Sequence, residues 1–427
     1  MGTTKETRIT SQEAKEAIYN AHLLLNSEIF KIGNVGEIGF GVGAIPTDKM
    51  PTGFTAMDGH YDKASANYGN VVDSSGSVMV AIPKFYFKIE GNTFFISSNE
   101  DNGYALHRMF INNDTEVDYV LVDKYTCGNV DGVFTSQFGL DPCSTSADHN
   151  SIALLNNTPS QNYGGLYEAV KTRSADHFLT TIYIYSGLAL LAKAHSDASI
   201  VATCAFKDVE PYLPKGCNNN ALADTNDSSV TYEASGYSNC GKTGAITNFA
   251  KTTHNGQDCG VADLNGNMYE VASGFIRYDS LGFLSFKEST DVRLIDGDST
   301  TQGSGGAYDS DLYDVVDLSD FIADTETGSW QGLGNAEEQV FTMSTDRTSN
   351  DYKKTMLGIP NLAGSSSSGT TEFGNDKIYR YLRNELACLC GLSWGHGSTA
   401  GAFAMGLSNA RYYSYYVVGG RASYLVQ

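Results

Sequence analysis

The segment from Gly260 to Val271 constrains the fold most, because it joins a tight turn to an immediate return into a core. Its centre is Asn265-Gly266-Asn267, residue types that accept the left-handed backbone conformation which short turns require. Apolar or aromatic side chains follow at once, at Met268, Tyr269 and Val271. We therefore expect this stretch to lie inside a packed, loop-rich domain.

Alternating apolar residues predict short strands in the first third of the chain. A proline removes a backbone donor, so we expect a break at Pro83 between two strands. A further strand is expected from Tyr119 to Tyr125. The alternating positions around Pro83 are Val78, Val80 and Ile82 before it, and Phe85, Phe87 and Ile89 after it.

One helix is predicted from Thr180 to His195, with Ile184, Leu188 and Leu191 on a single face. The apolar stretch within it is too short to span a bilayer and contains tyrosines, so it is expected to be buried rather than membrane-inserted. The region from Cys204 to Asn255 is rich in Asn, Ser and Gly and is expected to be a long ordered loop.

The N-terminal region is expected to be a separate unit of residues 1–75. Thr10 and Glu13 have capping-box spacing, which predicts a helix ending near Asn26. Its apolar stripe can pack on its own domain or form an oligomer seam, and packing on its own domain is favoured. A Gly- and Pro-rich β connector from Gly33 to about Ser75 follows.

Residues 76–427 are expected to form the second unit. Within them, residues from about 295 to 374 are interpreted as an insertion, because the stretch is strongly acidic and contains a run of serines between glycines. No repeat of fixed period is present, so a solenoid or a repeated fibre shaft is not predicted.

Composition excludes some partners. The formal net charge is −21, from 49 acidic and 28 basic residues, which disfavours binding to nucleic acid or to anionic membranes. The N-terminus shows neither a signal peptide nor a myristoylation pattern, and no transmembrane segment is predicted. Release from a cell is then expected to need lysis or another route.

Several segments resemble, in order, the formylglycine-generating-enzyme-like C-type-lectin folds, over roughly Val78 to the C-terminus. The strongest is Gly260–Glu270, which is very close to the family motif "G-L-x-D-M-x-G-N-V-W-E-W". The closing anchors resemble still more closely the variable proteins of diversity-generating retroelements, including phage tropism determinants. The other matching segments are Met79–Pro83, Tyr119–Cys127 and His177–Thr180, and the closing anchors are Gly391–Trp394, Ala400–Phe403 and Gly419–Arg421.

This resemblance implies an α+β, C-type-lectin-like domain with long loops and a variable region of about residues 392–427. In such proteins the side chains between fixed anchors are exchanged through mutation at adenines, and Tyr, Ser, Gly, His, Thr, Ala and Val are all reachable from Asn-type codons. The implied ligand-binding positions are Ser393, Gly395, His396, Thr399, Ala404, Gly406, Ser408, Tyr412, Tyr413, Tyr415, Tyr416 and Val417.

The anchors are expected to stay fixed. Trp394 and Phe403 should be core, Gly397, Gly401 and Gly419 should hold backbone turns, and Arg421 should close a buried polar contact.

Four of the chain's 26 tyrosines occupy positions within 412–416, a density that favours a binding surface. Tyrosine offers a large rigid contact area and a hydroxyl at low entropic cost. The alternative is that these residues form an ordinary aromatic strand, since tyrosine is a good strand former. Neighbouring residues of a strand point to opposite faces, so some of the four should be exposed in either case.

An enzyme is not predicted. The family that the chain resembles includes oxidases whose reactive cysteines follow a "G-G-S-W" segment. Gly391–Trp394 resembles that segment, and residues 393–427 contain no cysteine. Cys388 and Cys390, just before it, are expected to be buried structural thiols rather than a metal pair. Most of the eight cysteines are expected to be buried thiols, and Cys217 with Cys240 or Cys259 is the first candidate for a disulfide.

No cofactor or catalytic metal is predicted. The histidines lack H-E-x-x-H or H-x-H spacing, and Asp296-Gly297-Asp298 lacks the rest of an EF-hand loop. The resemblance to lectins leaves room for structural calcium held by loop carboxylates.

The sequence thus predicts a receptor-binding protein of a phage tail fibre that binds a host surface receptor, protein or glycan, without chemistry. The expected partners are that receptor, other tail-fibre proteins and two further copies in a homotrimer, in the virion. A bacterial surface or secreted diversified ligand-binding protein is the first alternative, and a formylglycine-generating-like oxidase is the second.

Overall fold

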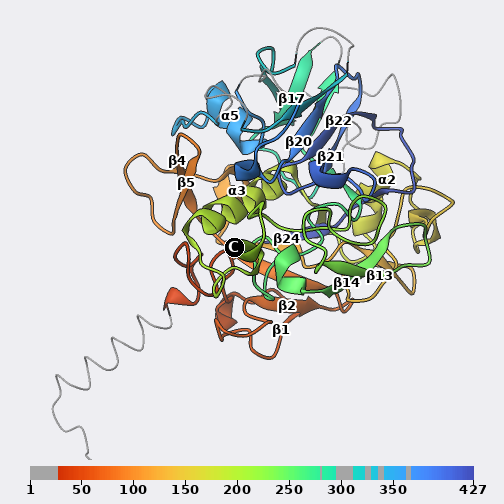
Figure 1. Cartoon of the computed structure of the whole chain (residues 1–427), viewed down its shortest axis with the longest axis horizontal. Coiled ribbons are helices and arrows are strands. Elements are labelled where there is room, and N and C mark those ends of the chain that lie inside the picture. Colours follow the sequence, from red (N-terminus) through yellow and green to blue (C-terminus); the bar gives the residue numbers. More distant parts are fainter. Residues whose placement is uncertain (1–26, 279–280, 295–310, 323–327, 335–340, 362–366) are drawn as a thin grey trace, which may run out of the picture.

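The structure is a computed structural model that describes residues 27–278, 281–294, 311–322, 328–334, 341–361 and 367–427. Two six-stranded sheets lie toward opposite ends of the molecule, with helix α3 (Ile182–Ala198) between them (Figure 1). The fold is α+β and rich in sheet. Among the described residues no helix combines the length and the apolar character that crossing a membrane requires.

The first sheet is antiparallel throughout and includes both an early strand and the last strand of the chain. Val80 lies opposite Val122, and Tyr424 lies opposite Leu121, so β24 pairs with a strand some 300 residues earlier. In spatial order its strands are β1 (Phe54–Ala56), β2 (Asn70–Asp73), β3 (Val78–Pro83), β9 (Tyr119–Asp123), β24 (Ala422–Val426) and β12 (Phe178–Leu179).

The second sheet is mixed, with β20 parallel to β22 and β15 parallel to β23. In spatial order its strands are β19 (Ser329–Gly332), β20 (Lys377–Arg380), β22 (Met405–Ala410), β21 (Leu386–Cys390), β15 (Tyr269–Ala272) and β23 (Val418–Gly419). This sheet carries most of the region that the sequence singles out for binding.

Smaller sheets and short helices complete the described structure. The sheets join β4 (Tyr86–Glu90), β5 (Thr93–Ser97) and β6 (Ala105–Leu106); β16 (Phe275–Tyr278), β17 (Gly282–Phe286) and β18 (Tyr313–Val316); β7 (Ile111–Asn112) and β8 (Thr115–Glu116); β10 (Gly128–Val130) and β11 (Val133–Thr135); and β13 (Thr231–Ala234) and β14 (Gly241–Thr247). The other helices are α2 (Tyr163–Val170), α5 (Asn350–Met356) and the 3₁₀ turns η1 (Thr47–Lys49), η2 (Arg108–Phe110), η3 (Ile152–Leu154), η4 (Ala205–Asp208), η5 (Phe249–Thr252), η6 (Thr371–Phe373) and η7 (Gly397–Thr399).

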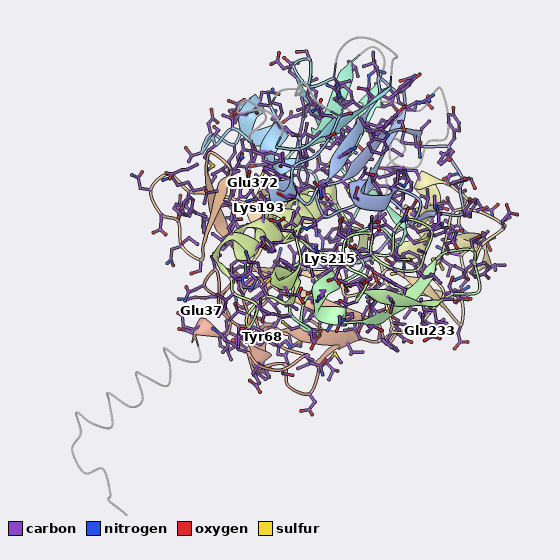
Figure 2. All side chains as sticks on the ribbon, viewed as in Figure 1. Glu37, Tyr68, Lys193, Lys215, Glu233 and Glu372 are labelled. Carbon is purple, nitrogen blue, oxygen red and sulfur yellow. The ribbon has the colours of Figure 1, made fainter. Side chains whose placement is uncertain are left out.

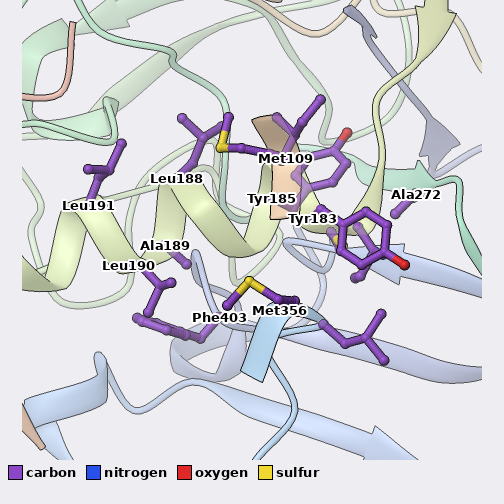
Figure 3. Packing of buried hydrophobic residues seen from close by; sticks show 14 of the residues in the cluster. Met109, Tyr183, Tyr185, Leu188, Ala189, Leu190, Leu191, Ala272, Met356 and Phe403 are labelled. Atoms are coloured by element: carbon purple, nitrogen blue, oxygen red, sulfur yellow. The ribbon is translucent and has the colours of Figure 1, made fainter. Parts of the chain in front are cut away.

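Helix α3 confirms the helix predicted from Thr180 to His195, displaced by two or three residues at its ends. It begins after Thr181, whose hydroxyl accepts the Ile184 N–H at 3.3 Å. Residues 182–196 are buried on every face, because other elements cover the helix all round. Figure 3 shows Leu190 facing Phe403 and Met356, while Leu188 and Leu191 point to the other side.

The strands predicted around Pro83 and at Tyr119 are confirmed as β3, β4 and β9. The turn at Asn265–Asn267 is confirmed as well, with Gly266 at φ +83°. The region from Cys204 to Asn255 is not a single long loop, because β13 and β14 form a hairpin within it.

The described part of residues 1–75 packs with the rest of the chain. Strand β2 pairs with β3 across the boundary expected near Ser75, and Phe40 and Tyr68 lie fully buried in the main core. The helix expected to end near Asn26 lies outside the described residues.

The described parts of residues 295–374 are also integrated. Strand β18 pairs with β17 and β19 pairs with β20. Lys193 of α3 lies 3.6 Å from Glu372, and Figure 2 shows the two side by side. Asp296–Asp298, like the rest of residues 295–310 and residues 323–327, lie outside the described residues.

Candidate functional site

The four tyrosines predicted to bind lie in a loop between β22 and β23, so the alternative of an ordinary aromatic strand is wrong. Tyr412, Tyr413 and Tyr415 are exposed, at 55%, 36% and 38%, and Tyr416 is half-buried. We call this segment, residues 412–416, the tyrosine loop. Three of its four phenol side chains are thus open to solvent.

The backbone of the tyrosine loop is fixed by Thr145. The Tyr415 N–H donates to Thr145 Oγ1 at 3.0 Å, and the Thr145 hydroxyl lies 3.1 Å from the Tyr415 carbonyl oxygen. The Thr145 N–H donates to the Val418 carbonyl at 2.9 Å, and the Ser414 hydroxyl donates to the Thr145 carbonyl at 2.5 Å. These bonds use backbone atoms of Tyr415 and Val418, so the tyrosine rings themselves stay free of this restraint.

The rings of the loop pack against one another and continue onto an adjacent loop. Tyr415 lies 5.5 Å from Tyr413 and 4.3 Å from Tyr416 between ring centroids. Tyr416 in turn stacks on His149 at 4.7 Å, and His149 lies 5.0 Å from Tyr237. The hydrogen bond to Tyr416 is the main cause that raises the pKa of Tyr415 to about 12, so its phenol is uncharged at neutral pH.

A second group of rings lies around His396. The Tyr269 hydroxyl and His396 Nε2 are 2.8 Å apart, and Trp330 meets His396 at 5.9 Å and Tyr379 at 4.9 Å in edge-to-face contacts. Burial lowers the pKa of His396, so the ring is neutral at physiological pH. Burial and then the phenols of Tyr413 and Tyr415 raise the pKa of Tyr269. The Tyr269 N–H donates to the Val417 carbonyl at 2.8 Å, so this group lies beside the tyrosine loop.

Four of the predicted ligand-binding positions need correction, because the structure buries them: Ser393, Ala404, Gly406 and Val417. Ser393 lies under its own turn, with its hydroxyl 3.1 Å from His396 Nδ1. Ala404 packs with Leu392 under Tyr269 and Trp330. A ligand cannot touch buried side chains without a rearrangement. The predicted positions that stay partly or fully exposed are Gly395, His396, Thr399, Ser408 and the four tyrosines.

The glycines of this region divide into two kinds. A Cβ at Gly395 or Gly406 would meet its nearest neighbours at 3.6 and 3.5 Å, which is ordinary contact. A Cβ at Gly401 would lie 1.7 Å from the Asp376 carboxylate, and one at Gly419 would lie 2.6 Å from the Cys143 carbonyl oxygen. These two glycines expected to vary therefore have room for a Cβ, and the two anchors have none.

The three anchor glycines were expected to hold backbone turns, but the structure requires glycine at two of them for another reason. Of the three glycines expected to hold turns, only Gly397, at φ +56°, has the left-handed conformation that favours glycine. Gly401 and Gly419 are restricted by close approach of neighbouring atoms instead. The other anchors, Trp394, Phe403 and Arg421, are buried.

Arg421 makes the buried polar contact expected of it. Its guanidinium donates to both carboxylate oxygens of Glu270 and, at 3.0 Å, to the Asp123 carbonyl. Asp123 also pairs with Arg173 at 2.7 Å, and Arg173 pairs with Asp73 at 2.6 Å. This network ties β24 to the strands that carry Asp123 and Glu270.

Five aromatic residues of the surface were not predicted from the sequence: His149, Tyr237, Tyr269, Trp330 and Tyr379. Four of these lie far from residues 392–427 along the chain, and Trp330 falls in the stretch interpreted as an insertion. Trp330 is one of only two tryptophans and Tyr269 ends the turn motif, which are the two signals that could have identified them.

All eight cysteines lie among the described residues and are buried free thiols, so the disulfide suggested for Cys217 is not formed. The Cys217 thiol instead lies 3.6 Å from the Asn239 carbonyl oxygen. Cys388 and Cys390 are buried in the main core, as expected. Within the described part of the chain, no three His, Cys, Asp or Glu side chains are grouped to hold a metal ion.

No family model matches the chain, and no curated protein matches it. Among solved structures, it is similar to the Major Tropism Determinant U1 Variant, at 9% identity and a TM-score of 0.28, over 90% of this chain and 85% of that one. The Major Tropism Determinant M1 Variant is 10% identical with a TM-score of 0.29, over 90% of this chain and 86% of that one. The I1 Variant is 10% identical with a TM-score of 0.28, over 90% of this chain and 85% of that one. TM-scores this low establish neither a shared fold nor a shared function.

Proposed function

We propose that this chain is a receptor-binding protein of a phage tail fibre, which binds a host surface receptor through its C-terminal surface and performs no chemistry. The observation that carries the proposal is the tyrosine loop, whose backbone is fixed by Thr145 while three phenol side chains are exposed. Rigid, solvent-facing tyrosines give a large contact area at low entropic cost. Such a surface suits recognition of a macromolecule.

The same proposal includes a C-type-lectin-like scaffold with a diversified surface. Support comes from the sequence motifs and from the two kinds of glycine: a Cβ fits at Gly395, which is exposed, and at Gly406, whereas none fits at Gly401 or Gly419. A protein whose surface is exchanged needs this separation between tolerant and intolerant positions. The burial of Cys388 and Cys390 gives no support to the oxidase alternative.

The assembly remains part of the proposal. We place the protein in the virion as a homotrimer, held to other tail-fibre proteins by residues 1–75, without nucleic acid or membrane insertion. Several copies on one particle would add avidity to weak single contacts. Structural calcium in a loop is compatible with the proposal but is not required by it.

Binding to cells tests the proposal. The purified full chain, labelled with a fluorophore, is added to cells of the bacterial strain that carries or propagates the gene. Replacing Tyr412, Tyr413 and Tyr415 together by Ala should weaken binding at least about thirtyfold, as expected for central aromatic contacts. Tyr61→Ala, an exposed tyrosine between β1 and β2, is the matched control and should bind like the parent chain.

Two results would contradict the proposal: a triple variant that folds and binds like the parent, or a parent chain that binds none of these cells. The DNA around the gene tests whether the protein belongs to the diversified class. We expect a near-copy of the DNA that encodes roughly residues 392–427, differing at adenines, beside a reverse transcriptase gene. Neighbouring virion genes would favour a phage, and their absence would favour the bacterial surface protein.

A further inference from the structure

The second group of rings is built mainly from outside residues 392–427. Trp330 on β19 lies directly opposite Tyr379 on β20, and both are half-buried. Tyr269 on β15 belongs to the same sheet. We call Trp330, Tyr379 and Tyr269 the aromatic shelf.

The aromatic shelf lies beside the tyrosine loop. His396 connects the members of the shelf, because its ring contacts Trp330 at 5.9 Å and its Nε2 atom lies 2.8 Å from the Tyr269 hydroxyl. The Tyr269 N–H donates to the Val417 carbonyl at 2.8 Å, immediately after the tyrosine loop. A partner that covers the loop would therefore also reach the neighbouring shelf.

We infer that the aromatic shelf is a constant half of the receptor surface, and that the partner is a protein face rather than a glycan. This inference rests on the proposed function and assigns to it a partner class and three further contact residues. The variable loop would then select among receptors, while the shelf adds the same contacts to every complex.

The arrangement of the rings favours a protein partner. A sugar ring stacks on an open aromatic face, but Tyr416 is stacked on His149 and lies 4.3 Å from Tyr415 on another side. Tyr379 and His396 meet Trp330 in edge-to-face contacts, which also occupy ring surface. The exposed tyrosines, Tyr412 above all, combine an apolar ring with a hydroxyl group, which suits the side chains and backbone groups of a protein.

The shape of the surface gives a second argument. Small ligands and short sugars are held in concave sites. The described cavities of about 340 and 240 Å³ are lined by other residues, around Tyr424 and around Cys259. Tyr412 of the tyrosine loop is instead more than half exposed. An exposed aromatic surface fits a broad protein face better than a small ligand.

Substitution of the shelf is the first test, in the full chain and with the same cells. Trp330→Ala combined with Tyr379→Ala should weaken binding at least about tenfold. Trp330→Phe combined with Tyr379→Phe keeps an aromatic ring at both positions and should weaken binding at least about threefold. This milder variant provides the test if the alanine variant does not fold. Tyr61→Ala again serves as the control, and melting temperatures report folding.

Treatment of the cells is the second test. We expect proteinase K treatment to abolish binding of the parent chain and periodate oxidation of glycans to leave it unchanged. The opposite pattern would overturn the assignment to a protein partner.

The outcomes separate this inference from the proposed function. If the tyrosine-loop variant loses binding but folded variants at both shelf positions bind like the parent, the shelf is not part of the surface and only this inference fails. If the parent chain binds no untreated cells, the proposed function itself fails.

Discussion

Arg421 and Glu270 lie 151 residues apart in the sequence and form a fully buried, two-point ion pair. Glu270 also accepts the Tyr185 hydroxyl at 2.7 Å and the Thr126 hydroxyl at 3.2 Å. The pair therefore connects the last strand of the chain to the turn motif and to helix α3. Each of the two charges is stabilised by the other, because neither side chain reaches solvent.

Arg421→Met should lower the free energy of unfolding by about 3–5 kcal/mol, since it leaves the Glu270 carboxylate buried without its cation. Chemical denaturation measures this change. In the double variant Arg421→Met with Glu270→Gln the uncompensated charge is gone, so at least about 1 kcal/mol should be recovered. A single variant as stable as the parent would show that the pair does not hold β24 in place.

Gly401→Ala should destabilise the protein by more than about 2 kcal/mol, because the new Cβ would overlap the buried Asp376 carboxylate. Gly406→Ala is the matched substitution in the next strand, and its Cβ has ordinary contact distances. Its effect should stay within about 1 kcal/mol, as seen in thermal or chemical unfolding. Equal effects of the two substitutions would remove the structural basis for separating fixed from variable glycines.

Tyr416 should contribute to stability more than its neighbours do. Its ring packs between His149 and Tyr415 and lies 6.0 Å from Trp394, whereas Tyr412 is more than half exposed. Tyr416→Ala should cost about 1–3 kcal/mol, and Tyr412→Ala less than about 0.5 kcal/mol. The comparison is made by unfolding both variants under the same conditions, and a reversed order would contradict the geometry of the loop.

The buried carboxyl of Asp376 should make stability fall with rising pH. Burial raises its pKa from 3.8 to about 8, although the Phe403 N–H and Lys215 partly oppose the shift. Between these two values the unfolded carboxyl has lost its proton while the folded one keeps it, so deprotonation favours the unfolded state. The stabilisation that the protonated Asp376 carboxyl gives to the folded state is therefore complete below pH 3.8 and is lost as pH approaches 8.

Asp376→Asn removes that titration. The free energy of unfolding of the parent chain, measured relative to the Asn variant, should therefore fall by more than about 1 kcal/mol between pH 4 and pH 8. The exposed Asp114→Asn is the control and should show no comparable trend. If the difference in free energy of unfolding between the parent chain and the Asn variant did not change with pH, Asp376 would already be charged in the folded protein.

Local patterns predicted the elements that depend on neighbouring residues. The alternation at Val78–Ile82, the capped helix after Thr181 and the turn at Gly266 are each specified within a few positions. The pairing of β19 with β20 was missed, because strand pairing between distant segments depends on tertiary packing that no local pattern encodes. The same reason hides Trp330 and Tyr379 from a search for binding residues.

The candidate surface was predicted in part for a related reason. The density of tyrosines at 412–416 pointed to the loop, and three of them are exposed. Ala404 and Val417 could not be recognised as buried, because small and medium apolar residues occur on surfaces and in cores alike. Their place was decided by Leu392, Trp330 and other residues packed over them.

The bonds from Thr145 to residues 414–418 have a consequence for how recognition could evolve. Nearly all of them reach main-chain atoms, so the restraint is indifferent to which side chains the loop displays. Each new combination of side chains would then start from the same ordered frame, and its affinity would reflect the chemistry of the exchanged groups rather than the entropy of arranging a mobile segment. Large jumps in specificity would become accessible in single steps, with the scaffold left as it was.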